Sequence, residues 1–287
     1  MTLRRHLDDA TAMLAEAGVG SPRVDAELLA AHAAGIERGR LALLTRPADL
    51  PAGFGDRFDN LVAERAKRVP LQHLIGTAAF GAVEVAVGPG VFIPRPETEA
   101  LLEWAVAQRL PPDPVIVDLC TGSGALALAL STQWPSARVI AVDDSPSALS
   151  YARRNLAGTG AELVEADVTT PGLRPDLDGA VDLLVANPPY IPDGVPLEPE
   201  VAAHDPAHAL FGGPDGMVVI HAITALAKRW LRDGARCGIE HDDTTSSQTV
   251  DAFGTAGGFA EVTPRRDLTG RPRFVTAMRR ADEAEVT

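Results

Sequence analysis

The sequence predicts an α/β protein whose main domain is a doubly wound, Rossmann-like sheet of mostly parallel strands. From residue 114 onward, short apolar runs of strand length alternate with helix-length segments, which is the pattern of parallel strands joined by helical crossovers. The segment "VIVDLCTGSGALALAL" places a glycine-rich turn between the first strand and its helix, as nucleotide-binding sheets do. Two strands near the end of the chain are expected to pair antiparallel at one side of this sheet.

Residues 1–72 are expected to form a small helical domain. Leu3, Leu7 and Leu14 lie roughly on one stripe of a first helix. Ser21-Pro22 supplies an N-cap followed by proline at the first helical position of a second helix. This domain has no glycine-rich loop and no reactive polar cluster. We interpret it as a substrate-recognition domain, with a merely stabilising extension as the alternative.

Residues 73–95 are expected to form a β-hairpin linker. Val83, Val85 and Val87 alternate along the chain, which predicts a strand, and a glycine-proline-glycine turn follows it. The sheet domain then occupies residues 96–287 and opens with a helix from about residue 96 to residue 110.

The elements of the sheet domain follow from apolar periodicity and from glycine and proline breaks. The expected strands cover residues 115–119, 138–142, 162–166, 181–186, 235–240, 259–263 and 274–278, and the expected helices cover 125–133, 146–156, 216–231 and 245–255. Because ligands of such sheets bind beyond the carboxyl ends of the strands, the residues that end each strand are the candidate site.

Composition and charge narrow the class of protein. The chain has 26 Lys and Arg against 39 Asp and Glu, a net charge of −13, which argues against a protein that mainly covers nucleic acid. Its two cysteines have no zinc-ligand spacing and no disulfide framework, so we expect a reducing compartment and no metal. Acids at positions 8 and 9 replace the apolar stretch of a signal peptide, and no apolar run approaches the roughly 18 residues of a membrane span. We expect a cytoplasmic protein without a membrane partner.

Three strand ends point to an adenosine-containing ligand. Gly122 and Gly124 let the backbone approach a ligand closely. Asp143, or alternatively Asp144, ends the second strand, where a carboxylate can accept both ribose hydroxyls. Asp167 ends the third strand and could bind an adenine amino group.

The first strand and its turn leave two cofactors open, NAD and S-adenosylmethionine. The dinucleotide fingerprint expects glycine where Cys120 stands. Asp118 would repel a pyrophosphate but would suit the ammonium group of a methionine moiety. These residues favour S-adenosylmethionine, and the fourth strand decides between the two.

The fourth strand ends in Asn187-Pro188-Pro189-Tyr190. A residue before proline is kept out of the α region, so this corner is rigid. We expect the Asn187 amide oxygen and the Pro188 carbonyl to act as two fixed acceptors for one –NH2 group, and Tyr190 to offer a flat face to a planar amide or base. Holding a planar nitrogen this way favours charge building on it as it attacks a methyl group. The catalytic candidates are therefore Asn187, Pro188 and Tyr190.

Four stretches together carry a family resemblance: "FIPRPETEALLEWA", "NPPYIP", "EPEVAAHDPAHALFGGPDGM" and "DLTGRPRFVTAMR". The chain resembles the HemK/PrmC family of peptide chain release factor glutamine methyltransferases over essentially its whole length. The resemblance implies an S-adenosyl-L-methionine-dependent enzyme that methylates N5 of the glutamine in the Gly-Gly-Gln motif of class 1 release factors.

The resemblance also assigns site residues. A loop with Arg95, Pro96, Thr98 and Glu99 is expected to close over cofactor and substrate. The implied substrate-binding residues are Arg95, Asn187, Pro188, Pro189 and Tyr190. The implied cofactor-binding residues are Thr98, Glu99, Asp118, Cys120, Thr121, Gly122, Gly124, Asp143, Asp144, Asp167, Val168 and Asn187.

One departure and several alternatives accompany this hypothesis. Cys120 stands where the family usually has glycine, so cofactor affinity would fall if a positive φ is required there, but we expect binding to survive because Gly122 and Gly124 keep the turn itself. The alternatives are a glutamine methyltransferase of a large-subunit ribosomal protein, an adenine-N6 nucleic-acid methyltransferase, and an inactive scaffold with the same fold. We expect a release factor as protein partner, no direct nucleic-acid partner, and a monomer, since a large partner must reach the sheet edge.

Overall fold

The structure is a computed structural model that describes residues 1–280 and divides into two compact units. The first unit comprises Met1–Thr77 together with Leu197–His204, and the second comprises Ala78–Pro196 and the chain from Asp205 onward. Each unit has its own hydrophobic core.

The first unit is helical, as the sequence predicts. Its elements are α1 (Leu3–Glu16), α2 (Pro22–Ala34), the 3-10 helices Arg38–Leu43 and Pro47–Asp49, α3 (Phe54–Ala66), α4 (Leu71–Ile75) and α8 (Pro199–His204). Leu14 and Leu29 are fully buried between the helices. Phe54 and Phe58 stack in the same core with their ring centroids 5.5 Å apart.

A buried arginine connects α8 to the helices of the first unit. Arg65 is 6% exposed and donates to Asp25 at 2.7 Å and to Glu200 at 2.8 Å. Arg68 also pairs with Glu200 at 2.8 Å. Since a buried cation needs compensating charge, these contacts explain why a segment more than a hundred residues away in sequence belongs to this unit.

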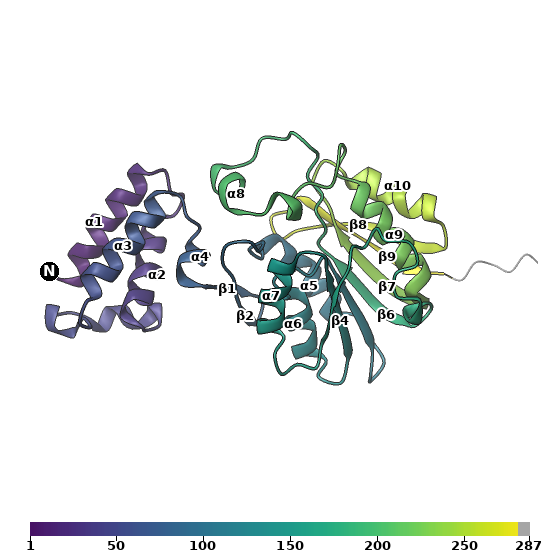
Figure 1. The fold of residues 1–287 in the computed structure, drawn as a ribbon, viewed down its shortest axis with the longest axis horizontal. Coiled ribbons are helices and arrows are strands. Elements are labelled where there is room, and N and C mark those ends of the chain that lie inside the picture. The colour runs from purple at the N-terminus through teal and green to yellow at the C-terminus, as the bar shows by residue number, and fades with distance from the viewer. Residues whose placement is uncertain (281–287) are drawn as a thin grey trace, which may run out of the picture. The chain divides into compact units, whose positions relative to one another are not determined.

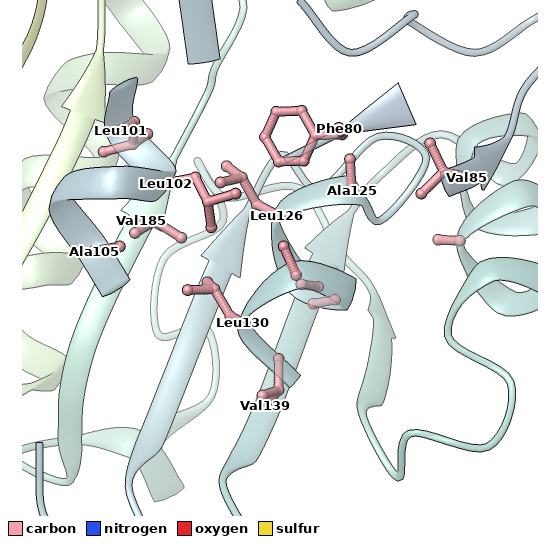
Figure 2. Close-up of a cluster of buried hydrophobic side chains, with 14 of the residues drawn as sticks. Phe80, Val85, Leu101, Leu102, Ala105, Ala125, Leu126, Leu130, Val139 and Val185 are labelled. Carbon is pink, nitrogen blue, oxygen red and sulfur yellow. The ribbon is translucent and has the colours of Figure 1, made fainter. Parts of the chain in front are cut away.

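The second unit begins with the predicted hairpin, β1 (Thr77–Phe80) and β2 (Val83–Ala86), which forms a two-stranded sheet. Phe80 and Val85 turn into a buried cluster that includes residues of α5 (Glu99–Val106) and α6 (Ala125–Gln133), as Figure 2 shows. The hairpin is therefore part of the core of this unit.

The main sheet has seven strands in the order β5-β4-β3-β6-β7-β9-β8. The strands are β3 (Val115–Leu119), β4 (Arg138–Asp143), β5 (Glu162–Glu165), β6 (Val181–Ala186), β7 (Leu231–Glu240), β8 (Phe259–Arg266) and β9 (Pro272–Arg279). The pairs from β5 to β7 are parallel, and β9 is antiparallel to both β7 and β8. The predicted doubly wound sheet with an antiparallel end is confirmed.

Helices cover both faces of this sheet (Figure 1). One cluster packs residues of α5, α6 and α7 (Pro146–Asn155) on one face, and a second packs α9 (Val218–Trp230) and α10 (Ser246–Ala256) on the other. Successive residues of β3 alternate between them: Ile116 lies in the first cluster and Val117 in the second. Apolar side chains on both faces of a parallel strand explain its continuous hydrophobic run.

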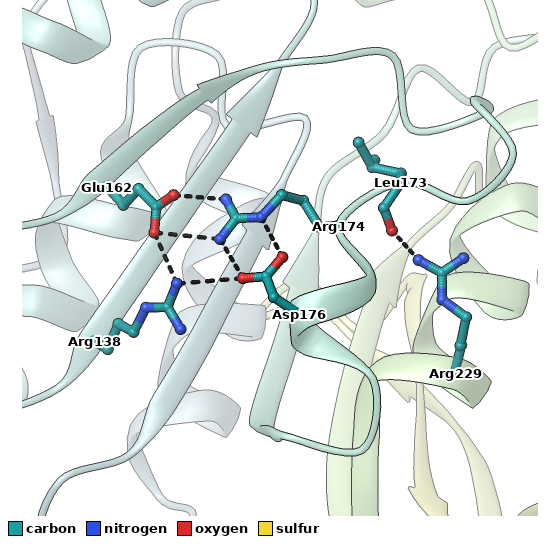
Figure 3. A network of polar contacts seen from close by, with 6 residues as sticks. All are labelled: Arg138, Glu162, Leu173, Arg174, Asp176 and Arg229. Atoms are coloured by element: carbon teal, nitrogen blue, oxygen red, sulfur yellow. Dashed lines mark hydrogen bonds and ion pairs between the residues drawn. The ribbon is translucent and has the colours of Figure 1, made fainter.

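A charged network lies at the amino ends of β4 and β5 (Figure 3). Arg174 pairs with Glu162 at 2.6 Å and with Asp176 at 2.8 Å, and Arg138 at the start of β4 pairs with the same Glu162 at 3.0 Å. Nearby, Arg229 of α9 donates to the Leu173 carbonyl oxygen. These contacts hold the chain between β5 and β6 at the edge opposite the strand carboxyl ends.

Two differences from the sequence prediction concern α8 and the start of β7. The short helix α8 carries no apolar stripe, so hydrophobic periodicity does not reveal it. Strand β7 begins directly after α9, four residues earlier than predicted, with a register shift against β6. Within residues 1–280, none of the helices has the length and apolar character needed to cross a membrane. The same residues contain no group of three or more His, Cys, Asp and Glu side chains that could hold a metal ion.

Candidate active site

The register of the parallel strands aligns four site residues at the carboxyl edge of the sheet. Leu119 of β3 pairs with the residues of β4 and β6 at the same level, and β7 continues this register from β6. The next position on each strand therefore falls in one row, which from β4 to β7 reads Asp143, Cys120, Asn187 and Glu240. Three of these residues were predicted from the sequence, and Glu240 was not.

Asp143 is tied to the glycine turn. Its Oδ2 accepts the Gly122 backbone N–H at 2.8 Å and its Oδ1 accepts the Ser145 backbone N–H at 2.9 Å. Burial raises the pKa of this carboxyl. Gly122 and Gly124 have positive φ angles of 57° and 81°, and a Cβ on Gly122 would meet no atom within 4 Å. The turn thus leaves free space beside a fixed carboxylate, as close approach of a ligand requires.

Asp118 supports the same turn from inside the sheet. It is 0% exposed, and its Oδ2 accepts from the Thr121 hydroxyl at 2.5 Å and from the Ala127 backbone N–H at 3.1 Å. Its Oδ1 is buried and has no hydrogen-bond partner among the described residues. Burial raises the pKa of Asp118 to about 7. Its predicted contact with an ammonium group stays a prediction.

Cys120 has the positive φ angle that the sequence analysis considered at this position. Its φ is 57°, in the left-handed region where glycine is favoured. A residue with a Cβ costs about 1–2 kcal/mol in that region. The side chain packs partly against the second hydrophobic cluster, and burial raises the pKa of its thiol well above the usual value. This position therefore stores local strain at the middle of the row.

The remaining cofactor candidates lie beside this row. Asp167 is exposed and accepts from the backbone and hydroxyl of Thr169, both at 2.7 Å, whereas Val168 is buried. Asp144 pairs with His208 at 2.6 Å, and its carboxylate raises the pKa of that imidazole. His208 comes from the loop after the Asn-Pro-Pro-Tyr corner, so this loop contacts the end of β4. His208 is not among the site residues predicted from the sequence.

Asn187 is oriented by Thr98. The Asn187 side-chain Nδ2 donates to Thr98 Oγ1 at 3.1 Å, and Thr98 is only 4% exposed at the start of α5. No donor within residues 1–280 bonds to Asn187 Oδ1 or to the Pro188 carbonyl oxygen. The corner therefore presents two acceptors whose hydrogen-bonding capacity is unused.

Two glycines of the "GGPDGM" stretch pack against this corner. A Cβ on Gly212 would lie 2.4 Å from the Pro189 carbonyl oxygen, and one on Gly216 would lie 2.1 Å from the Tyr190 carbonyl oxygen. Ile191 also donates its N–H to Leu210 O at 2.8 Å. The glycines are thus required by close backbone contact, and they fix the corner in place.

The Tyr190 hydroxyl points to the end of β7. It donates to Glu240 Oε1 at 3.0 Å, and Glu240 is 1% exposed. Burial raises the pKa of Glu240 to about 7, and it also raises the pKa of Tyr190. The positive charge of Arg273 lowers the pKa of both groups. The turn that precedes β9, the strand of Arg273, is organised by Asp267, which accepts from the Thr269 backbone and hydroxyl and from the Arg271 backbone.

Arg95 and Glu99 lie at the entry to α5. Arg95 pairs with Asp205, and its guanidinium lies 4.9 Å from the centroid of the Phe92 ring. Glu99 is the first residue of α5, after the 3-10 helix Pro96–Thr98. Of this predicted loop, the structure connects Thr98 to the corner; contacts of Arg95 and Glu99 with a ligand stay predictions.

The fold and the site define a class, the Rossmann-like methyltransferases with an Asn-Pro-Pro-Tyr corner. The PrmC N-terminal domain family matches residues 6–76, and the methyltransferase small domain family matches residues 85–203. The chain is 68% identical to a release factor glutamine methyltransferase of Mycolicibacterium smegmatis over 277 residues, which cover 96% of this chain and 98% of the relative. It is 63% identical over 283 residues to that of Mycobacterium tuberculosis strain H37Rv (97% and 92% covered), and 47% identical over 281 residues to that of Corynebacterium glutamicum (96% and 99% covered).

The chain therefore belongs to the release factor glutamine methyltransferase family. It is a methyltransferase with S-adenosyl-L-methionine as methyl donor. The residues present fit this cofactor: free space beside Gly122, an exposed Asp167 at the third strand end, and a buried Asp118 oxygen with unused hydrogen-bonding capacity.

Proposed function

We propose that this chain methylates N5 of the glutamine side chain in the Gly-Gly-Gln motif of a class 1 peptide chain release factor, as a cytoplasmic monomer. The observation that carries the proposal is the pair of unused acceptors at the carboxyl end of β6. Asn187 Oδ1 and the Pro188 carbonyl oxygen belong to one rigid corner, and Thr98 holds the other end of the Asn187 amide. A primary amide has two N–H groups, one for each acceptor.

The residues of the corner would make the amide nitrogen reactive by positioning and by electrostatics. S-adenosylmethionine, when bound, supplies an electrophilic methyl group on a positively charged sulfur. Asn187 Oδ1 and Pro188 O would bind the two N–H groups and so favour positive charge on the nitrogen as its bond to the methyl carbon forms and the sulfur–methyl bond breaks, which leaves a neutral thioether. One N–H proton would pass to solvent water after the transfer, and until then it would be bonded to one of these two oxygens. No general base is required.

The cofactor would be held at the β4 end of the row. Asp143 would accept the ribose hydroxyls; in support, both of its oxygens are fixed by backbone N–H groups and keep further lone pairs. Asp167 is exposed where an adenine amino group is expected. Thr121 and Asp118 fix the turn through their 2.5 Å contact.

The net charge of the chain and the names of its relatives both favour a glutamine over an adenine as the methyl acceptor. The relatives that match nearly the full length are named release factor glutamine methyltransferases. The net charge of −13 disfavours a nucleic-acid substrate. We assign a substrate-recognition role to the first unit, where the PrmC N-terminal domain family matches residues 6–76.

Labelled S-adenosylmethionine tests the proposal directly. The purified chain is incubated separately with a class 1 release factor, with the same factor carrying glutamate in place of the motif glutamine, with large-subunit ribosomal protein, and with DNA. We expect label on the unmodified release factor alone, and its loss with Asn187→Ala. Label only on ribosomal protein or DNA would overturn the proposal. Analytical ultracentrifugation tests the monomer.

A further inference from the structure

Glu240 is a buried carboxyl group beside the reactive corner that the proposed chemistry does not use. It is the last residue of β7, and the pairing of Ala186 with Ile239 places it next to Asn187 along the carboxyl edge. It is 1% exposed, and its Oε2 has no hydrogen-bond partner among residues 1–280, which is unusual for a buried carboxylate oxygen.

Two hydroxyl groups of the site surround this carboxyl. The Tyr190 hydroxyl donates to Glu240 Oε1 at 3.0 Å. The Thr98 hydroxyl also lies near Glu240 and lowers its pKa, and the same hydroxyl accepts from Asn187 Nδ2 at 3.1 Å. Glu240 thus neighbours both Tyr190, which belongs to the Asn-Pro-Pro-Tyr corner, and Thr98, which holds the Asn187 amide.

Hydrogen-bond polarity gives this arrangement a direction. An ionised carboxylate only accepts, whereas a hydroxyl has one proton to donate. With the Thr98 proton directed to Glu240, only the lone pairs of its oxygen remain for Asn187. The Asn187 amide must then turn its –NH2 group toward Thr98 and its Oδ1 away from it. A Thr98 proton turned toward the unpartnered Glu240 Oε2 would thus make the orientation of Asn187 depend on the charge on Glu240.

We propose that Glu240 is a positioning residue for methyl transfer, which as a carboxylate directs the hydroxyl protons of Tyr190 and Thr98 toward itself and thereby aims Asn187 Oδ1 at the substrate amide. The proposal rests on the proposed function, because it takes an –NH2 group as the partner of Asn187. It adds a residue that touches neither substrate nor cofactor.

The charges around Glu240 set the pH at which it acts. Burial raises its pKa, the Thr98 and Tyr190 hydroxyls and Arg273 of β9 lower it, and Glu97 of the 3-10 helix before α5 raises it, to about 7 in sum. The next residue of the chain, His241, is buried, and burial lowers its pKa, so it adds no positive charge near neutral pH. Glu240 is therefore a carboxylate above about pH 7 and loses its charge below it.

The kinetic test compares Glu240→Gln with Glu240→Asp. The side-chain amide of a glutamine has two N–H donors, so one of the two hydroxyl groups must accept from it. The hydroxyl protons are then no longer both directed to residue 240, and the orientation of Asn187 is no longer fixed. We expect kcat to fall about tenfold with Glu240→Gln, the size of one hydrogen bond to a charged group, with less than about a twofold change in KM for the release factor. In the wild type, kcat should fall as the pH drops through about 7. We expect Glu240→Asp to show the same fall and Glu240→Gln to show none. Glu103→Gln, an exposed site on α5, is the matched control.

A second readout does not depend on turnover. The side-chain amide resonances of Asn187, assigned by their loss in Asn187→Ala, are expected to shift with pH around a midpoint near 7 in the wild type and to stay constant in Glu240→Gln. Full kcat with an unchanged pH limb in Glu240→Gln, or amide resonances that do not respond to pH in the wild type, would refute the role of Glu240. A wild type that leaves the release factor unlabelled but shows the amide titration would instead contradict the proposed function alone. Should Glu240→Gln not fold, Glu240→Asp and the wild-type titration still decide.

Discussion

Thr98→Val removes the group that holds the Asn187 amide while keeping the shape of the side chain. Thr98 is 4% exposed, so the valine fits the same space, and Asn187 Nδ2 loses its acceptor at 3.1 Å. One neutral hydrogen bond contributes about 1 kcal/mol, and Asn187 is only half-buried, so part of the lost bond is replaced by water. We expect the free energy of unfolding to fall by about 1 kcal/mol.

The effect on turnover follows from the same bond. Without Thr98, the Asn187 amide loses the bond that fixes the orientation in which Oδ1 is presented to the substrate. A loss of about 1 kcal/mol in positioning corresponds to about a fivefold lower kcat.

The assay is the initial rate of label transfer to the release factor, together with urea unfolding of each variant. Thr98→Ser retains the hydroxyl and serves as control, with kcat within about twofold of the wild type. A Thr98→Val enzyme with undiminished kcat would show that Asn187 does not depend on Thr98.

Four further changes probe other parts of the account. Gly216→Ala drives a Cβ into the carbonyl oxygen of the corner tyrosine at a position with positive φ, so activity on the release factor should fall at least tenfold, as label transfer measures. Cys120→Val places a β-branched residue at φ 57° and should lower the free energy of unfolding by about 2 kcal/mol, as urea unfolding measures. Cys120→Gly should change it by less than about 1 kcal/mol, because the relief of backbone strain is offset by the greater entropy of the unfolded chain. Burial raises the pKa of Asp118 from 3.8 to about 7. Between these two pH values the folded protein binds more protons than the unfolded chain, so its free energy of unfolding falls as pH rises. Asp118→Asn should remove this pH dependence, which urea unfolding between about pH 4 and pH 7 measures. Arg65→Met leaves buried Asp25 without its cation and should cost about 3–5 kcal/mol, seen as a lower melting temperature of the first unit, with Arg65→Lys milder.

The strands were predictable because each is a short apolar run between breaks. Val115–Leu119 and Val181–Ala186 have the predicted bounds, since both faces of these strands are buried and the apolar run coincides with the strand. Helix α8 was not predictable in the same way. It belongs to the first unit through Arg65 and Glu200, and a contact between residues 135 positions apart leaves no periodic signal.

The site was predictable where it lies at strand ends and unpredictable where it depends on contacts across the fold. Asp143 and Asn187 follow apolar runs and were found by that rule. The same rule applies to Glu240, which ends the run of β7, so a signal for it was present in the sequence. The bond between Thr98 and Asn187 spans 89 residues, and only the packing of α5 beside β6 brings them together.

Tandem mass spectrometry of the release factor is the most direct measurement of the central claim. After incubation with the purified chain and S-adenosylmethionine, the peptide that contains Gly-Gly-Gln should gain the mass of one methyl group, and fragmentation should place it on the glutamine side chain. Asn187→Ala should leave the same peptide unmodified. A methyl group on any other residue, or an unmodified peptide with the folded wild-type chain, would contradict the account.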